Sequence, residues 1–308
     1  MDKVISIIQT ALPVFMALAL GAICRGRKFL TRDGVDTLKK VVINITLPAV
    51  LLNAFATAEY SLAALILPAV MFGLCCLALA LGHLIIRISG MKSRLAPYLA
   101  TGFEAGMLGY ALFALLFPDV SISNFALPDI GQTLFVFTLY KILLSGKTDL
   151  KAIGKDMATT PILWAVFAGV LIGATGLYGK MQQWGVSGIL NSVTGFISAP
   201  TAMIILLTVG YDLVLKEIPW KKTAGLIAMR LMVMAVLMAV TVLLNRTVLD
   251  GMFFEGAAIL IFILPPPYVI PVFADEPEER VQISSALSAL TLVTVALFAV
   301  LSVVVGMQ

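Results

Sequence analysis

The feature that most constrains this chain is its series of apolar runs, each about 20 residues long. A helical run of that length, at about 1.5 Å per residue, crosses a hydrocarbon layer of about 30 Å. Hydrophobic residues make up 60% and charged residues 12% of the 308 positions, whereas soluble domains have about half and about a quarter. Backbone polar groups must be satisfied internally in a bilayer, and the continuous runs do not alternate as barrel strands do. The sequence therefore predicts an all-α integral membrane protein.

Ten membrane-spanning helices can be placed along the chain. They cover residues 4–24, 34–56, 62–88, 94–117, 127–146, 159–177, 186–211, 220–245, 253–273 and 280–305. The connectors are short and carry charge or helix breakers, and YGKMQQWG at 178–185 is expected to be a loop. The longest connector, SGKTDLKAIGKD, follows helix 5. It divides the chain into one five-helix unit at 1–150 and a second at 151–308.

The positive charges predict the orientation. Loop lysines and arginines are concentrated after helices 1, 3, 5, 7 and 9, whereas the opposite side has Lys3, Lys180 and Arg246. Basic loops remain in the cytoplasm. Both termini are therefore expected outside a cell membrane, inner or plasma, which the chain crosses several times.

The two halves show signs of an internal repeat. Pro13 in helix 1 matches Pro161 in helix 6, and Pro48 in helix 2 matches Pro200 in helix 7. Helices 4 and 9 are each interrupted, by Gly102, Gly106 and Gly109 in the first and by Pro265, Pro266 and Pro267 in the second. Because five is odd, the second half runs inverted, the pattern of secondary transporters with broken helices. The alternative is that proline and glycine are simply common in membrane helices.

Several segments resemble the auxin efflux carrier family, which includes plant auxin exporters and bacterial malate or malonate permeases. TGFEAGMLGYALF resembles the family's N-x-G-x-x-G-x-P crossover in helix 4, and LPVFMALALGAICR and NITLPAVLLNAFA resemble its first two helices. ILPPPYVIPVFADEPEERVQISSALSALTLVTVAL resembles its ninth and tenth helices. The resemblance covers nearly the whole chain.

The resemblance implies a ten-helix fold related to bile-acid and sodium–proton transporters. Helices 1, 2, 6 and 7 would form a scaffold, and helices 3–5 and 8–10 a mobile domain in which helices 4 and 9 cross. The family moves organic anions, usually by an elevator-like motion. Two positions depart from its pattern, since Glu104 replaces the usual asparagine and Ala111 the usual proline. A glutamate in this context is also similar to the bile-acid symporters, where the equivalent chemistry binds sodium.

The charged residues inside the predicted spans are candidates for ion coupling. Glu104 lies in the middle of an apolar span, where a carboxylate is costly unless it is paired or faces water. We therefore expect Glu104 to bind a coupling proton or sodium ion, together with Asp129 and Arg230. The alternative is a structural carboxylate that accepts bonds from backbone N–H groups freed by the interruption. Arg230 is expected to pair with a carboxylate, either Glu104 or Asp129, and this pair is either structural or part of the substrate site.

The interruptions predict the substrate site. The amino-terminal ends of half-helices expose unpaired N–H groups and a partial positive charge, which favour an anion. Three consecutive prolines remove backbone donors and leave carbonyls for a cation or a polar group. The expected lining is Gly106, Gly109 and Tyr110 of helix 4, Pro266, Pro267 and Tyr268 of helix 9, Asn44, Thr46, Pro48 and Asn53 of helix 2, and Ser198, Pro200 and Thr201 of helix 7. The two tyrosines could equally be ordinary packing residues.

Other functional classes find less support in the sequence. The chain has one histidine, His83, and no G-x-x-x-x-G-K-[ST] motif, so neither an H-E-x-x-H zinc site nor a P-loop is present. Tyr211-Asp212 begins an intramembrane aspartyl protease motif, but no G-x-G-D follows. We therefore expect no enzyme activity, no cofactor, no metal and no nucleic-acid partner. The predicted partners are a small organic acid, the lipid bilayer and a second copy of the chain in a homodimer.

The function predicted is ion-coupled secondary transport of small organic anions by an elevator-type alternating-access mechanism. One alternative is a carrier for a neutral or cationic solute, with Glu104 as the counter-charge. A channel should show a continuous polar stripe along several helices, and a sensor should carry a signalling domain. Neither feature is evident in the sequence.

Overall fold

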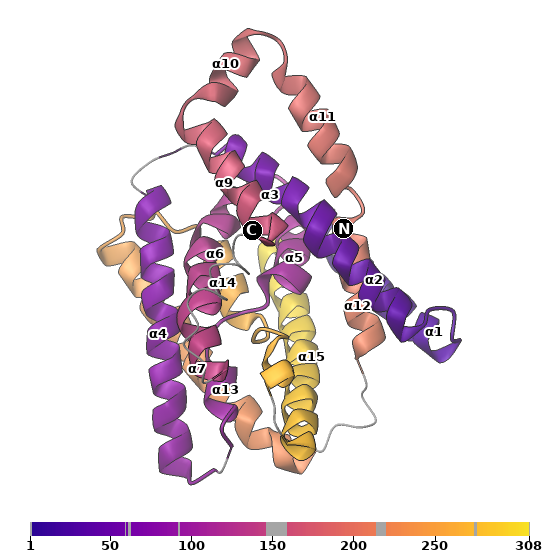
Figure 1. The fold of residues 1–308 in the computed structure, drawn as a ribbon, viewed down its shortest axis with the longest axis vertical. Helices are drawn as coiled ribbons and strands as arrows, with labels where there is room; N and C mark the ends of the chain where they lie inside the picture. The colour runs from indigo at the N-terminus through magenta and orange to yellow at the C-terminus, as the bar shows by residue number, and fades with distance from the viewer. Residues whose placement is uncertain are drawn as a thin grey trace.

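A computed structural model describes residues 2–58, 60, 63–91, 93–145, 159–213, 220–273 and 276–307, and every regular element within them is helical (Figure 1). In the first half these elements are α1 Asp2–Gly26, α2 Arg32–Val41, η1 Val42–Thr46, α3 Leu47–Ala56, α4 Ala63–Ser89, η2 Ala96–Ala100, η3 Ala105–Gly109, α5 Tyr110–Leu116, α6 Ser123–Phe135, η4 Val136–Tyr140 and α7 Lys141–Ser145. In the second half they are α9 Pro161–Ala174, α10 Leu177–Gln183, α11 Ser187–Ser198, α12 Thr201–Asp212, α13 Trp220–Thr247, α14 Glu255–Ile263, η6 Ile270–Phe273 and α15 Pro277–Met307.

Six helical stretches in the described part of the chain are long and apolar enough to cross a membrane. They are Arg32–Ala56, Ile66–Ser89, Ser123–Leu144, Ser187–Asp212, Thr223–Thr247 and Glu278–Gly306. A seventh arises if α9 and α10, which bend by 65° between them, count as one crossing. The apolar stretches Ala11–Gly26 and Ala105–Leu116 are shorter. The chain is thus all-helical in its described residues, with several helices fit to cross a bilayer.

Three of the long stretches change helix type or bend within their length. The stretch Arg32–Ala56 contains the π-helical turn η1, which ends at Thr46, two residues before Pro48 near the start of α3. Proline has no backbone N–H, so the regular hydrogen-bond ladder cannot continue through it. In the stretch Ser187–Asp212, the boundary between α11 and α12 falls at Pro200 for the same reason. The stretch Ser123–Leu144 contains a second π-helical turn, η4.

Close helix contacts depend on glycine at several interfaces. A Cβ on Gly21 of α1 would lie 2.1 Å from the carbonyl oxygen of Leu207 in α12, and one on Gly210 would lie 2.1 Å from that of Leu18. Small residues let helix backbones approach in a membrane, where packing rather than the hydrophobic effect drives association. The Gly21–Gly210 pair therefore fixes how closely α1 and α12 can lie.

The helices pack in two sets. In the first set, α1 packs on α12, and α3 packs on both α9 and α11. In the second, α4 packs on α6 and η2, while α13 contacts α4, α14 and α15. The sets meet where α1 contacts α15, α12 contacts α5 and α3 contacts α6. Helices α10 and α11 extend beyond the other helices at one end of the molecule (Figure 1).

One detail of the sequence prediction is wrong, and one helix end is shifted. The connector at 178–185 was expected to be a loop, but most of it belongs to helix α10, Leu177–Gln183. The start of helix 5, predicted near residue 127, lies at Ser123 in α6, where the Ser121 and Ser123 hydroxyls share a hydrogen bond. The predicted connector at 145–156 lies almost wholly outside the described residues.

Candidate functional site

The first interruption separates η2 from η3. After Ala100 the backbone is non-helical through Glu104, and Gly102 has a φ of +66°. A Cβ on Gly102 would lie 2.9 Å from Cγ of Pro267. Glycine is therefore required at this position for two reasons. Residues with a side chain disfavour this φ, and the second interrupted helix lies against the Gly102 backbone.

The second interruption follows α14 and meets the first. Leu264 is extended, the three prolines at 265–267 follow, and regular structure resumes at η6. Proline has no N–H to donate, so this segment contributes mainly carbonyls. The backbone N–H of Glu104 donates to the carbonyl oxygen of Pro265 at 2.8 Å. The two breaks are therefore joined directly through their backbones.

The Glu104 carboxylate bridges the chain beyond both breaks. Its Oε1 accepts from the N–H of Met107 at 3.0 Å, and its Oε2 accepts from the N–H of Tyr268 at 2.8 Å. Both N–H groups lie where the chain resumes after an interruption, and an acidic group is favourable where such donors are exposed. This is the geometry of the structural alternative for Glu104, and it leaves the ion-coupling prediction untested.

Arg230 of α13 stabilises backbone carbonyls of the two breaks, whereas Glu104 stabilises backbone N–H groups. Its guanidinium donates to the carbonyl oxygen of Leu99 at 3.2 Å and to that of Leu264 at 2.9 Å. These carbonyls lie at the carboxyl-terminal ends of the first half-helices, where a cation is favourable. The expectation that Arg230 pairs with a carboxylate is wrong within the described residues, because its bonded partners are carbonyls. The side chain is sealed, with 1% exposed.

Other neighbours satisfy further backbone groups of the breaks. The side chain of Gln132 in α6 accepts from the N–H of Phe103 at 2.6 Å, and the Thr294 hydroxyl in α15 donates to the carbonyl oxygen of Ile263 at 2.6 Å. The Tyr140 hydroxyl donates to the carbonyl oxygen of Tyr98 at 3.1 Å. Non-helical backbone at membrane depth is tolerated only where protein or a water-filled cavity satisfies it. Side chains from three surrounding elements, α6, η4 and α15, meet that condition here.

Asp129 is a second buried carboxyl group near the place where the two interruptions meet, which we call the crossing. It lies on α6 with 8% of its surface exposed, and its Oδ2 accepts from the Tyr110 hydroxyl at 2.7 Å. Its Oδ1 has no partner among the described residues. Both carboxyl oxygens of Glu104 thus accept a hydrogen bond, whereas only one oxygen of Asp129 does so among the described residues.

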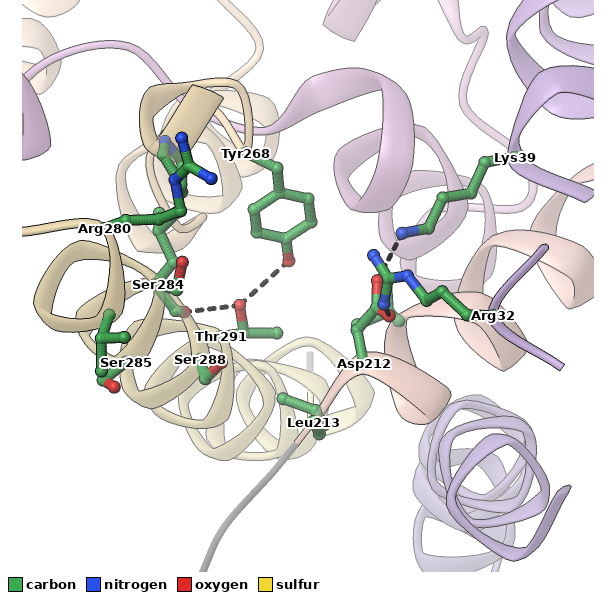
Figure 2. A pocket seen from close by; sticks show the side chains of 14 residues that line it. Arg32, Lys39, Asp212, Leu213, Tyr268, Arg280, Ser284, Ser285, Ser288 and Thr291 are labelled. Carbon is green, nitrogen blue, oxygen red and sulfur yellow. Dashed lines mark hydrogen bonds and ion pairs between the residues drawn. The ribbon is translucent and has the colours of Figure 1, made fainter. Parts of the chain in front are cut away.

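A cavity of about 600 Å³ opens beside the crossing (Figure 2). It combines cations, one carboxylate, hydroxyl groups and apolar side chains, contributed by Arg32, Lys39, Val209, Asp212, Leu213, Tyr268, Pro271, Arg280, Val281, Ser284, Ser285, Leu287, Ser288 and Thr291. Asp212 forms ion pairs with Arg32 and Lys39 on one side, and the Tyr268 and Thr291 hydroxyls share a 2.9 Å hydrogen bond on the other. We call this the charged cavity.

A second cavity, of about 400 Å³, has no charged side chain among the described residues that line it. Its walls come from the α3 region, α5, the segment before α6 and the junction of α11 and α12: Val50, Asn53, Ala54, Thr57, Tyr110, Ala111, Ala114, Ser121, Ile122, Ser198, Ala199, Thr201 and Ala202. The Oδ1 of Asn53 is buried without a partner among the described residues. We call this the neutral cavity.

The predicted substrate residues do not converge on one cavity. Tyr268 lines the charged cavity, whereas Asn53, Tyr110, Ser198 and Thr201 line the neutral one. The others line neither, namely Asn44, Thr46, Pro48, Gly106, Gly109, Pro200, Pro266 and Pro267.

The residues outside the cavities have various environments. The side chain of Asn44 is exposed and donates to the carbonyl oxygen of Lys40 at 2.8 Å. Thr46 is buried, and its hydroxyl has no partner among the described residues. A Cβ on Gly109 would lie 2.8 Å from Cδ1 of Leu264, so this glycine lets the two interrupted helices approach.

Sequence reasoning missed the ionic and hydroxyl lining of the charged cavity. In the sequence, Arg32 is one of the basic residues after helix 1 that predict the orientation, and Asp212 is part of an incomplete protease motif. A signal for the hydroxyl wall was present, because Ser284, Ser288 and Thr291 recur at helical spacing in the last predicted span. Residues three and four apart share one face of a helix.

Comparison with known proteins supports a transporter. No family model matches the chain, so the resemblance to auxin efflux carriers remains a prediction. The chain is 27% identical over 213 residues to a protein of Methanothermobacter thermautotrophicus named "Uncharacterized transporter", and the alignment covers 67% of each chain. With the apolar helices, this similarity supports a multi-pass membrane protein.

Proposed function

We propose that this protein is an ion-coupled secondary transporter of small organic anions. In this proposal the chain crosses a cell membrane ten times, as two inverted five-helix repeats at 1–150 and 151–308. Transport proceeds by an elevator-type motion of one helix set past the other. The basic loops face the cytoplasm, and both termini lie outside.

The observation that carries the proposal is the meeting of two interrupted helices. Glu104 joins them through its backbone N–H to Pro265 and through its carboxylate to Tyr268. Paired broken helices are characteristic of secondary transporters, in which half-helix ends face the substrate and its coupling ion. The relative named as a transporter agrees with this class.

The position of the two cavities supports alternating access. The charged cavity has α2 and α12 on one side and the segment after α14 with α15 on the other. The neutral cavity has α3, α11 and α12 on one side and α5 on the other. Each cavity therefore has α12 of the first helix set on one side. The other side is α15 of the second set for the charged cavity, and α5, which follows the first interruption, for the neutral cavity. Sliding one helix set past the other would change access to both cavities. In this proposal two copies of the chain form a homodimer through the first set, which keeps that set stationary while the second set moves.

The charges favour an anion as the solute. Among the described residues, Arg32, Lys39 and Arg280 line the charged cavity together with one carboxylate, that of Asp212. The described lining thus has more positive than negative charges, and an excess of one sign in a cavity concentrates the opposite charge. Glu104 and Asp129 are then left for ion coupling by a proton or sodium. A neutral or cationic solute is the alternative, in which one of these carboxylates contacts the solute.

The deciding experiment is uptake into proteoliposomes. Purified protein is reconstituted, a panel of labelled mono- and dicarboxylates that includes malate is supplied, and proton or sodium gradients are imposed separately. Uptake that follows one gradient and stops when an ionophore collapses it would support the proposal and identify the ion. Uptake of labelled cations or neutral solutes, with no response to any carboxylate, would overturn the anion assignment.

A further inference from the structure

The cations at one end of the charged cavity already hold a carboxylate that belongs to the chain. Asp212, the last residue of α12, accepts from Arg32 through Oδ1 at 2.5 Å and from Lys39 through Oδ2. Arg32 and Lys39 are both on α2. The two oxygens of one carboxylate therefore bridge two cations, as an organic acid entering the cavity could.

The pairing is accessible enough to be exchanged. The Arg32, Asp212 and Lys39 side chains are 62%, 32% and 24% exposed. Ion pairs that water reaches contribute little net stability, because solvent and salt screen them. A soluble carboxylate can therefore compete with Asp212 for the two cations at a modest free-energy cost.

The remainder of the cavity suits the rest of such a molecule. Beyond the ion pairs lie the Tyr268 hydroxyl and the serine face of α15, with Ser284 and Ser288 (Figure 2). Leu213 and Val281 add apolar surface. Binding sites of this kind combine apolar walls with a few polar groups that fix orientation.

We propose that Asp212 is an internal competitor for the substrate carboxylate, occupying Lys39 and Arg32 until an organic anion displaces it. The inference rests on the proposed function, because it requires the solute to be an organic anion. It adds the position at which the carboxylate is recognised and a residue that sets the affinity for it. The crossing itself, where the Glu104 carboxyl group already accepts from the N–H groups of Met107 and Tyr268, is then not the place where the substrate carboxylate binds.

The chain offers a matched control for Asp212. Asp36 of α2 belongs to the same ion cluster, 3.5 Å from Arg32 and 4.0 Å from Lys39, and its side chain is 45% exposed. It does not line the charged cavity. Asp36→Asn thus removes the same charge from the same cluster without removing the competitor from the cavity.

The test compares malate uptake by wild type, Asp212→Asn and Asp36→Asn in proteoliposomes. Asp212→Asn is expected to lower the half-saturating malate concentration by about two- to fivefold, the scale of an exposed ion pair. Asp36→Asn is expected to change it less than twofold. An equal effect of the two variants, or a higher concentration for Asp212→Asn, would overturn the inference and leave the proposed function standing. If no carboxylate is taken up by wild type, both fail together.

A second measurement needs no variant, in case Asp212→Asn does not fold. Wild-type protein in detergent is treated with an amine-acylating reagent, and modification of Lys39 and its exposed neighbour Lys40 is quantified by mass spectrometry. Malate at concentrations that saturate uptake fills the cavity beside Lys39 and excludes the reagent from it. It is therefore expected to slow acylation of Lys39 but not of Lys40, whereas choline should protect neither. Equal acylation of Lys39 with and without malate would overturn the inference.

Discussion

The two ends of the interrupted helices are stabilised by opposite charges in different surroundings. Arg230 holds the ends at which the first half-helices stop, and Glu104 holds the places at which the chain resumes. Arg230 is almost completely buried, whereas Glu104 is partly exposed. Both charges complement the local helix dipole, so electrostatics alone does not distinguish them.

Access to solvent does distinguish them. A sealed guanidinium bonded to two carbonyls cannot exchange its partners without breaking the packing around it. Glu104 is bonded to Tyr268, whose side chain lines the charged cavity. The comparison therefore assigns Arg230 to the stability of the crossing and Glu104 to a position where a solute or ion can affect its contacts.

The largest effect is expected from Arg230→Met. The carbonyl oxygens of Leu99 and Leu264 lose their donor, and each buried unpaired group costs about 1–3 kcal/mol, so stability should fall by about 2–6 kcal/mol. Thermal unfolding in detergent measures this. Arg246→Met is the control, because Arg246 lies on the same helix but is 67% exposed and paired with Glu255. Equal melting temperatures of the two variants would remove Arg230 from its structural role.

Glu104→Gln comes next and should act on transport more than on folding. The amide retains one acceptor for Met107 or Tyr268 but loses the charge, and bonds to charged groups contribute about 1.5–3 kcal/mol. Gradient-driven malate uptake should fall by about 10- to 100-fold, while exchange of internal for external malate without a gradient continues. Glu255→Gln, an exposed glutamate at the start of α14, serves as the control. Loss of uptake and exchange in parallel with stability would make Glu104 purely structural.

The sequence locates the interruptions and the buried charges, but it does not give their partners. Consecutive prolines and closely spaced glycines break a helix wherever the chain goes, so both breaks could be placed. Glu104 and Tyr268, however, are 164 positions apart, and Lys39 and Asp212 are 173 apart. Such contacts depend on how the helices cross, which no local pattern records.

Local boundaries were missed for a different reason. Gly176 and Gly185, with φ values of +69° and +74°, flank α10 as its breaks, and the lysine, methionine and glutamines between them are good helix formers. Charge and polarity in that segment suggested a loop. A short polar helix between two glycines is indistinguishable from a loop by composition alone.

A smaller effect is expected from Tyr110→Phe, which tests the one-sided bonding of Asp129. Without the hydroxyl, neither oxygen of Asp129 has a partner among the described residues, which should cost about 1–3 kcal/mol. Thermal unfolding of Tyr110→Phe, Asp129→Leu and the double variant forms a cycle. The double variant should be more stable than the sum of the single losses predicts. Simple additivity would mean that the bond contributes nothing.

The smallest effect is expected from Tyr268→Phe, on the accessible side of the crossing. The variant loses the hydroxyl contact with Thr291, but Thr291 still donates to the carbonyl oxygen of Leu287, and the Tyr268 N–H still donates to Glu104. The loss of stability should be about 0.5–1.5 kcal/mol. Expressed as a free energy, the change in the half-saturating malate concentration should exceed the loss of stability, because the hydroxyl faces the charged cavity. A destabilisation as large as that of Arg230→Met would mean that both sides of the crossing are structural, and the distinction between its sealed and accessible charges would not hold.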